Sequence, residues 1–563
     1  MKSIQDFPDE KRGEKESLDI SLEGAPLALG ASIDDDDLPK GFWRRKVKRE
    51  LDATATQPSV FDDPVTLEIY RPPVAYENAH RFDPNARWTW REEKRLVRKV
   101  DLRIMVWAFV MFFALDLDRS NISQANTDNF LEDLKLTTDD FNLGNTLFRL
   151  CFLIAELPSQ LVSKRVGPDV WIPSQMVLWS VVSWSQFWLS GRSSFLATRS
   201  LLGLLQGGFI PDVVLYLSYF YTKKELPIRL AWFWVSNYLT DIVGAFLATG
   251  ILRIRGHNGR SGWRYLFLIE GLFTCIAGLI SFALMPAGPT QTKAWFRPNG
   301  WFSEREEVIM VNRVLRDDPS KSDMHNRQGL TPKMIWQALR DWRMWPIYIL
   351  GLVHMIPVGA PQVYLTLSLR NLGFTTTQSS LLSIPAYVIG TIGLVLTAYL
   401  SEIINSRVLS TVILQFWALP LLIALYTFNT HTSQWVYFTV VTLIVGFPYV
   451  HPIQVAWASR NSYSVRTRTI SASMYNIFVQ AGAIIYANIY QTKDKPLYKK
   501  GNRALIGICA MNIVLYALTF LFYRALNKHR ESIWSAMTAE ERAEYQETTK
   551  DVGNQRLDFR FAY

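Results

Sequence analysis

Charged side chains recur inside the most apolar stretches of this sequence. The run IMVWAFVMFFAL (104–115) is followed at once by Asp116, Asp118 and Arg119. An ionisable group in hydrocarbon costs roughly 2.5–3.5 kcal/mol on insertion scales, so such groups face a protein interior or a water-filled path. Asp116 and Arg119 are three residues apart and can pair along one helix. These residues indicate a polar cavity inside a membrane-embedded bundle.

Two further arginines in apolar stretches point to an anionic ligand. Together with Arg119, the side chains of Arg149 and Arg199 would form a cationic centre if all three faced inward. A planar guanidinium group suits carboxylate, sulfonate, sulfate or phosphate. Structural ion pairs are the alternative for each arginine. Asn476 and Gln480 share one face of a later stretch and would add a neutral polar lining.

Carboxylates in the same stretches are candidates for carrying a proton. Glu156 follows Arg149 by two helical turns, and Asp212 lies in the same stretch as Arg199. A buried carboxylate that gains a proton on one side and releases it on the other couples transport to a proton gradient. We therefore expect substrate binding from the arginines and proton coupling from Glu156, Asp212 or Asp116.

About twelve apolar stretches, each long enough to cross a bilayer, must position these side chains. Six lie within residues 99–285 and six within residues 344–524, on either side of a polar segment, 286–343. This layout predicts an all-α membrane protein with twelve transmembrane helices in two six-helix halves. Glycine and proline predict interruptions of three of these helices, at QGGFIPD (206–212), HMIPVGAP (354–361) and GFPYVHP (446–452).

The polar segments are expected to lie in the cytoplasm. Surplus lysine and arginine between the predicted second and third helices, and between the fourth and fifth, places both termini inside. In residues 1–98 few apolar residues recur at a regular spacing, so we expect a largely disordered tail. Residues 286–343 are expected to form a linker, and residues 525–563 a C-terminal tail. The polar N-terminus predicts no cleaved signal peptide.

Several classes of function find no support in the sequence. The three cysteines, Cys151, Cys275 and Cys509, have no metal-ligand or redox spacing, so we expect no metal and no cofactor. The HExxH, GxSxG and GxxxxGK[ST] motifs are absent, which argues against an enzyme. The net charge of +10 is attributed to membrane topology, so no nucleic acid is expected. A nutrient receptor that binds without transporting stays open, because it would need the same site.

Several stretches carry a family resemblance: LDLDRSNISQA, QGGFIPDVVLYLSYFYTKKELPIR, SGWRYLFLIEGL and TKDVGNQRLDFRFAY. They resemble fungal major facilitator superfamily transporters of the anion:cation symporter, or allantoate permease, family. The resemblance implies proton symport of a small anion across the plasma membrane, with an endomembrane as the alternative. Arg119 and Arg199 match arginines that related transporters use for substrate. Those relatives often carry glutamate where this chain has Gln206, which moves the expected proton role to Glu156 or Asp212.

The substrate is the least defined of these expectations. The pattern is closest to that of the yeast transporter of sulfonates and inorganic sulfur anions, so sulfonates and sulfur oxyanions come first. Allantoate, nicotinate, pantothenate and other carboxylates stay open, because guanidinium chemistry specifies only an anion. We expect the protein to act as a monomer in the lipid bilayer, with the anion and protons as its partners.

Overall fold

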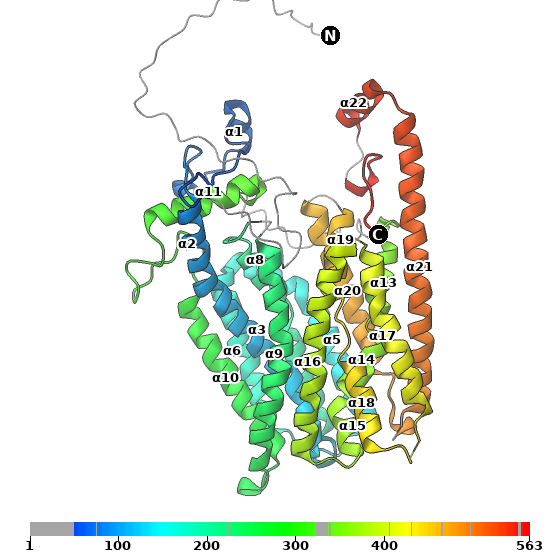
Figure 1. Cartoon of the computed structure of the whole chain (residues 1–563). Coiled ribbons are helices and arrows are strands. Elements are labelled where there is room, and N and C mark those ends of the chain that lie inside the picture. The colour runs from blue at the N-terminus through cyan, green and yellow to red at the C-terminus, as the bar shows by residue number, and fades with distance from the viewer. Residues whose placement is uncertain are drawn as a thin grey trace, which may run out of the picture.

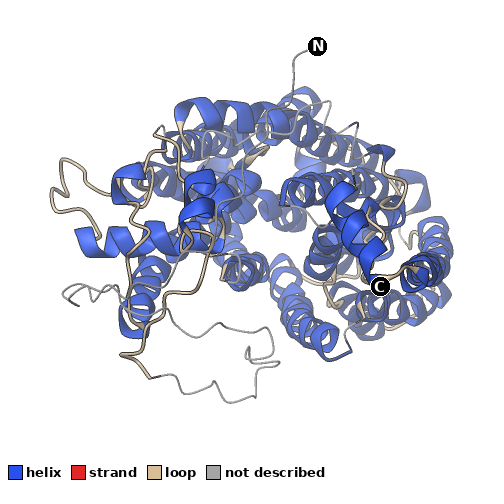
Figure 2. Ribbon diagram, turned by 90° about the horizontal axis from the view of Figure 1, so that it is seen from above, coloured by secondary structure: helices blue, strands red, loops and turns tan. Residues whose placement is uncertain are grey.

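Helices arranged in two groups make up the protein (Figure 1). The computed structural model describes residues 50–74, 76–222, 225–322, 336, 339–404, 406–429, 431–462, 465–495, 497–549 and 553–563. Within these ranges the regular elements are helices, and no β-strand occurs. Viewed along the bundle, the two groups stand side by side (Figure 2). The all-α prediction is confirmed.

The first group holds the helices between residues 90 and 284. α2 (Trp90–Val100) continues through a π-helical turn (Asp101–Met105) into α3. The closest packing joins α6 to α10, α5 to α7, and α3 to both α9 and α10. The helices that follow α2 are α3 (Val106–Ala125), α4 (Phe130–Asp133), α5 (Thr138–Val166), α6 (Pro168–Ser185), α7 (Arg192–Gln206), α8 (Phe209–Leu217), α9 (Leu226–Ile251) and α10 (Gly262–Leu284).

The second group holds the helices after residue 344. α21 packs on α17, α20 packs on α13 and α19, and α16 joins the two groups by packing on α9. The helices are α13 (Trp345–Val353), α14 (Ile356–Val363), α15 (Leu365–Asn371), α16 (Thr376–Ile404), α17 (Arg407–Thr427), α18 (Gln434–Val445), α19 (His451–Ser462), α20 (Val465–Ala487), α21 (Lys499–Ala536) and α22 (Ala539–Thr548).

Seven segments of the described chain are long and apolar enough to cross a membrane. They are Arg192–Leu217, Trp232–Ile254, Gly262–Leu284, Trp345–Val363, Thr376–Ser401, Arg407–Thr427 and Lys499–Ala536. The other predicted spans coincide with helices that are shorter, interrupted or more polar, namely α3, α5, α6, α18 with α19, and α20. The count of twelve spans and the cytoplasmic position of the termini stay predictions.

The three interruptions predicted from glycine and proline are confirmed. α7 gives way to α8 after Gln206, α13 to α14 after Val353, and α18 to α19 after Val445. At the first break Gly208 has φ +87, and a Cβ there would lie 2.4 Å from the side chain of Ser159. Only glycine fits this backbone and this space. The break between α7 and α8 therefore depends on Gly208 and on the contact with Ser159 of the neighbouring helix.

Residues 50–98 fold against the segment that separates the two halves. The sequence predicts little fixed structure here, but α1 (Pro64–Tyr70) and α2 lie beside α11 (Glu304–Asp317) (Figure 1). Phe61 and Trp88 are buried, and Arg316 of α11 binds the carboxylate of Asp62. These contacts are non-local and have no helical period, so the sequence pattern does not reveal them. Residues 1–49 lie outside the described part, and the predicted domain limits stay predictions.

Candidate functional site

Arg119 lies on α3, where the predicted pair with Asp116 forms. Its Nη1 atom is 3.9 Å from Oδ1 of Asp116, and Oδ2 of Asp116 accepts a hydrogen bond from Asn237 of α9. Nε of Arg119 donates a hydrogen bond of 3.0 Å to Oε1 of Gln206 on α7. The guanidinium carbon is 5.0 Å from the ring centre of Phe152. Nη2 is buried and has no partner among the described residues, so this arginine keeps a free donor.

Arg199 lies on α7 and is 4% exposed. Its Nη2 atom donates a hydrogen bond of 3.0 Å to Asn145 of α5, and its guanidinium carbon is 4.6 Å from the ring centre of Phe148. In the described part of the chain it pairs with no carboxylate, and its buried Nε has no partner. α5 and α7 approach closely because Gly203 lacks a side chain, since a Cβ there would lie 2.2 Å from the carbonyl oxygen of Phe148.

Arg149 lies on α5 and reaches the second half of the protein. Its Nη1 atom donates a 3.0 Å hydrogen bond to Oε1 of Gln480, and its Nη2 atom donates one of 3.0 Å to the hydroxyl of Tyr486. Both acceptors lie on α20. Asn476, on the same helix, is half-buried, and its side chain makes no hydrogen bond to a described residue. The structure thus joins Arg149 to one of the two predicted polar residues of α20.

The three arginines form a site with excess positive charge. Arg199 is close enough to both Arg149 and Arg119 for repulsion, and Arg149 also acts on Arg119. Asp116 is the single carboxylate that makes an ion pair with any of the three within the described ranges. Like charges repel strongly where water is scarce, and a buried charge without a counter-charge is costly. The arrangement therefore favours an anion between α3, α5 and α7.

The predicted proton carriers lie in two places. Asp116 belongs to the arginine site. Glu156 is buried on α5 and interacts electrostatically with Asp212 of α8, next to the break between α7 and α8. The carboxylate of Asp212 accepts a hydrogen bond of 3.4 Å from Ser159, whereas the carboxylate of Glu156 makes no hydrogen bond or ion pair with a described residue. Among the described residues, no hydrogen bond or ion pair joins these two carboxylates directly to the arginines.

The halves also meet through polar contacts at one end of the bundle. Asn142 donates a hydrogen bond of 2.6 Å to the carbonyl oxygen of Tyr490 and accepts one from the hydroxyl of Tyr364. Asn488 donates one of 2.7 Å to Thr146. This is the end at which α15 lies, opposite α2 and α11 (Figure 1). The arginine site is therefore closed off on this side by contacts between the halves.

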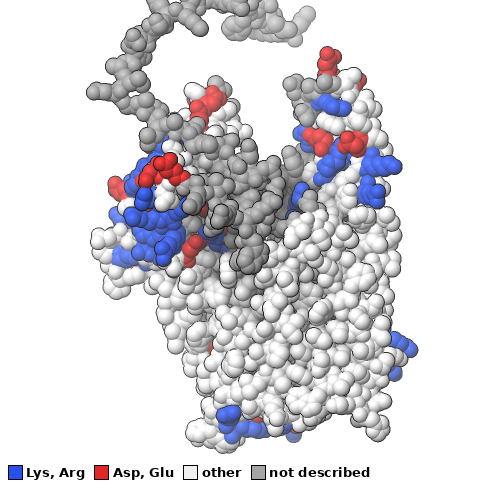
Figure 3. Space-filling model, viewed as in Figure 1, with Lys and Arg blue, Asp and Glu red and all other residues white. Residues whose placement is uncertain are grey.

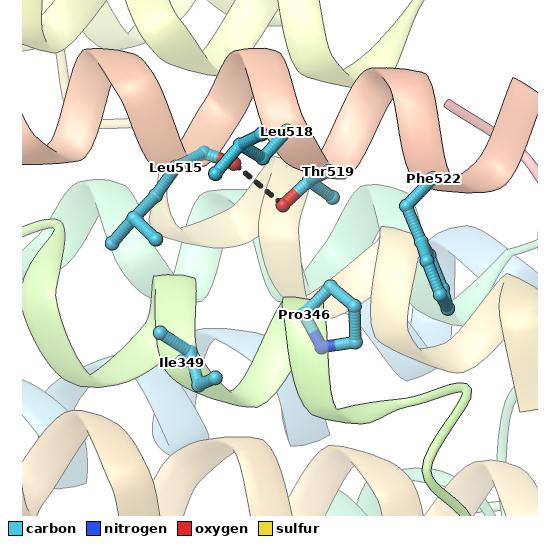
Figure 4. Close-up of a pocket in the computed structure, with 6 residues that line it drawn as sticks. All are labelled: Pro346, Ile349, Leu515, Leu518, Thr519 and Phe522. Atoms are coloured by element: carbon cyan, nitrogen blue, oxygen red, sulfur yellow. Dashed lines mark hydrogen bonds between the residues drawn. The ribbon is translucent and has the colours of Figure 1, made fainter.

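A groove between α13 and α21 is apolar and separate from the arginines. Pro346, Ile349, Leu515, Leu518, Thr519 and Phe522 line it (Figure 4). The hydroxyl of Thr519 is occupied by a hydrogen bond of 2.8 Å to the carbonyl oxygen of Leu515. This lining suits hydrocarbon and offers nothing to an anion. Among the described residues no group of three or more His, Cys, Asp or Glu side chains is arranged to hold a metal ion.

Sequence reasoning found the arginines but missed most of their partners. Phe148, Phe152, Asn145 and Tyr486 lie on other helices or turns and give no signal on their own. Gln206 is the exception, since a family resemblance had drawn attention to that position.

Comparison with known proteins identifies the family. The Major Facilitator Superfamily profile matches residues 108–487. The uncharacterized transporter YIL166C of Saccharomyces cerevisiae is 45% identical over 91% of this chain and 95% of its own length. A bacterial homolog of the human lysosomal transporter Spinster, solved in an inward-facing and occupied conformation, covers 75% of this chain and 96% of its own, with TM-score 0.53 and 14% identity.

A second solved structure has the same fold. The xylose transporter XylE of E. coli, in a partially occluded inward-open conformation, covers 75% of this chain and 97% of its own, with TM-score 0.53 and 13% identity. These relatives are transporters and not enzymes, and the fold that they share is that of multi-pass membrane proteins acting on small solutes. The chain described here belongs to the Major Facilitator Superfamily.

Proposed function

We propose that this transporter imports a small anion by proton symport. The observation that carries the proposal is the surplus of charge at Arg119, Arg149 and Arg199. These three guanidinium groups interact with one another, and among the described residues only Arg119 has a carboxylate partner, Asp116. A neutral substrate would leave this charge unmatched. An anion would balance it, because charge-assisted hydrogen bonds from guanidinium are strong and directional.

Free donors support a ligand with several oxygen atoms. Nη2 of Arg119, Nε of Arg199 and Nε2 of Gln206 are buried and have no partner among the described residues. An unsatisfied buried donor costs roughly 1–3 kcal/mol, which a ligand oxygen would recover. The rings of Phe148 and Phe152 beside these groups would contact a small organic part. The donors and rings together fit a compact oxyanion with a short carbon chain.

The sulfur anions are the first candidates for the substrate. A sulfonate or sulfate offers three or four oxygens to the three free donors, and the sequence pattern favours the same class. Carboxylates such as allantoate, nicotinate or pantothenate are the alternative, since a carboxylate also binds a guanidinium group in a bidentate fashion. Import across the plasma membrane follows from the same resemblance.

Asp116 offers a physical route to proton coupling. Its carboxylate lies 3.9 Å from Arg119 and competes with the substrate for that arginine. A proton on Asp116 would remove the competing charge, so the proton and the anion would bind cooperatively. Glu156 and Asp212, beside the break between α7 and α8, would then pass the proton toward the other end of the bundle.

Uptake of labelled isethionate tests the proposal in fungal cells that lack their own transporter for it. We expect saturable uptake that is faster at external pH 5 than at pH 7 and that is lost in Arg119→Ala. Arg253→Gln, at an exposed arginine beyond α9, is the matched control and should keep uptake. Binding without accumulation would favour a receptor. Surface-localised protein that takes up no sulfonate, sulfate or carboxylate would overturn the anion assignment.

A further inference from the structure

We propose that Arg103 and Arg297, which both lie beside the ring of Trp301, bind the phosphate headgroup of an anionic phospholipid. We call these three residues the headgroup site. Arg103 lies in the π-helical turn that leads into α3, and Arg297 and Trp301 lie in the loop between α10 and α11. The headgroup site is separate from Arg119, Arg149 and Arg199 and does not depend on the proposed substrate.

Two like charges lie beside one indole ring, that of Trp301. The guanidinium carbon of Arg297 is 4.2 Å from the ring centre of Trp301, and that of Arg103 is 5.7 Å from it. Nη1 of Arg103 also donates a hydrogen bond of 2.8 Å to the carbonyl oxygen of Trp301. Neither arginine makes an ion pair with a described carboxylate. Partial burial and the charge of Arg103 lower the pKa of Arg297, as expected for two cations in close proximity.

The headgroup site lies where the protein surface changes from basic to apolar. Along the continuous helix α2–α3, Arg95 and Arg98 are exposed, whereas the next exposed residues on the helix include Leu102 and Val106, at 63% and 51% exposure. Lysine and arginine gather at the α2 and α11 end, above a wall of the bundle that is almost free of charge (Figure 3). Such a change marks the level at which headgroups meet hydrocarbon.

Exposed aromatic side chains place the loop at the same level. Trp295 is 93% exposed and Phe296 is 47% exposed, in the turn that carries Arg297. The backbone of Ala294 and Arg297 closes this turn, and Nε of Arg297 donates a hydrogen bond of 2.7 Å to the carbonyl oxygen of Thr292. Aromatic residues prefer the membrane interface, so these side chains would enter the bilayer and hold the headgroup site against it.

A phospholipid explains this surface better than a soluble anion. Free phosphate would neutralise Arg103 and Arg297 but would leave Leu102 and Trp295 in water. A phospholipid would cover both, with phosphate at the arginines and its acyl chains against the apolar part of α3. Each cation near an anionic leaflet contributes about 1 kcal/mol to lipid attraction. With the predicted orientation, the headgroup site faces the cytoplasmic leaflet, which carries the anionic lipids.

Native mass spectrometry of the purified full-length protein, with phosphatidylinositol or phosphatidylcholine added in detergent, tests the proposal. We expect the protein to retain phosphatidylinositol in preference to phosphatidylcholine. The double variant Arg103→Gln, Arg297→Gln should lose roughly tenfold or more of this retention. The matched control, Arg253→Gln with Lys493→Gln, removes two exposed charges outside the headgroup site and should keep it.

Two further measurements distinguish lipid binding from loss of fold and from binding of free phosphate. Arg103→Lys with Arg297→Lys preserves the charge and should retain most of the lipid, which separates loss of charge from loss of fold. Inorganic phosphate at the same concentration should not displace phosphatidylinositol. Equal retention of phosphatidylcholine, unchanged retention by the glutamine variant, or full displacement by inorganic phosphate would each overturn the proposal.

Discussion

Nη2 of Arg149, on α5, donates a hydrogen bond of 3.0 Å to the hydroxyl of Tyr486, on α20. The bond crosses from one half of the transporter to the other, and it comes from a group that we place in the substrate site. An anion that bound Arg149 would compete with Tyr486 and Gln480 for the same donors. Substrate binding would thus loosen or reshape a contact between the halves, as alternating access requires.

Arg149→Lys should reduce uptake at least tenfold while leaving the protein folded. An ammonium group is a point charge and lacks the planar fork that reaches both Gln480 and Tyr486. Initial rates of labelled substrate uptake, corrected for surface protein, measure the effect. Tyr486→Phe keeps the ring beside the guanidinium and should cost less, about threefold to tenfold, because a typical hydrogen bond contributes roughly 0.5–1.5 kcal/mol. Wild-type rates in Arg149→Lys would remove Arg149 from the substrate site.

Gln206→Glu should weaken anion binding. The new carboxylate would stand where Oε1 of Gln206 now accepts a 3.0 Å hydrogen bond from Arg119, and would compete with the substrate for that charge. We expect KM to rise by about tenfold or more, in keeping with 1.5–3 kcal/mol for a hydrogen bond to a charged group. Gln206→Leu adds no charge and serves as the comparison. A lower KM in Gln206→Glu would show that Arg119 does not meet the anion.

Asp116→Asn should abolish the acceleration of uptake at acid pH. The amide cannot lose a proton, so Arg119 would no longer be released from its carboxylate by acid. Uptake at pH 5 and pH 7 would then differ by less than twofold, and the substrate would equilibrate without accumulating. If Asp116→Asn keeps the pH response and Glu156→Gln or Asp212→Asn loses it, coupling resides beside the break between α7 and α8 instead.

The folded segment at residues 50–98 should depend on Asp62. Burial raises the pKa of Asp62, but its hydrogen bond with Arg316 outweighs this, so that the pKa lies below the usual value. Because the pKa of Asp62 is lower in the folded chain, its carboxylate stabilises the fold when the pH is above its pKa in the unfolded chain, about 3.9. This stabilisation is lost as the pH falls through the pKa of the folded chain. Hydrogen exchange, corrected for intrinsic rates, should show residues 50–98 protected from pH 5 to 7 and less protected below about pH 4.

Two substitutions separate this effect from general instability. Asp62→Asn removes the charge that binds Arg316 and should lower protection roughly fivefold or more at pH 7. Asp52→Asn is the matched control, because the side chain of Asp52 is 69% exposed in its pair with Arg91 and exposed pairs contribute little. Equal loss of protection in both variants would contradict the role given to Asp62.

Much of the fold follows from local sequence. Long apolar stretches fix where the helices lie, and glycine with proline fixes the three breaks, because these signals act within a few residues. The pairing of Asp116 with Arg119 is also local, at one helical turn. The folded segment at residues 50–98 could not be predicted from local sequence. Its buried Phe61 and Trp88 come from irregular segments and pack against distant parts of the chain.

The arginines of the candidate site could be predicted from local sequence, but their partners could not. An arginine in an apolar stretch is easily noticed, because placing its charge in a membrane costs free energy and so indicates a specific role. Which groups it meets depends on helix packing: Gln206 is 87 residues from Arg119, and Tyr486 is 337 residues from Arg149. No local pattern encodes such pairs. The close approach of α5 and α7 at Gly203, which brings Arg149 and Arg199 near each other, is likewise visible only in the structure.

The central claim is that the charge of Arg119, Arg149 and Arg199 selects an anion. Its most direct test is competition for uptake of labelled substrate into proteoliposomes, comparing anions with neutral compounds of the same size. We predict that sulfonates, sulfate or carboxylates compete, that their uncharged amides and alcohols do not, and that Arg119→Gln loses uptake. Equal competition by charged and neutral compounds, with transport intact in Arg119→Gln, would contradict the account.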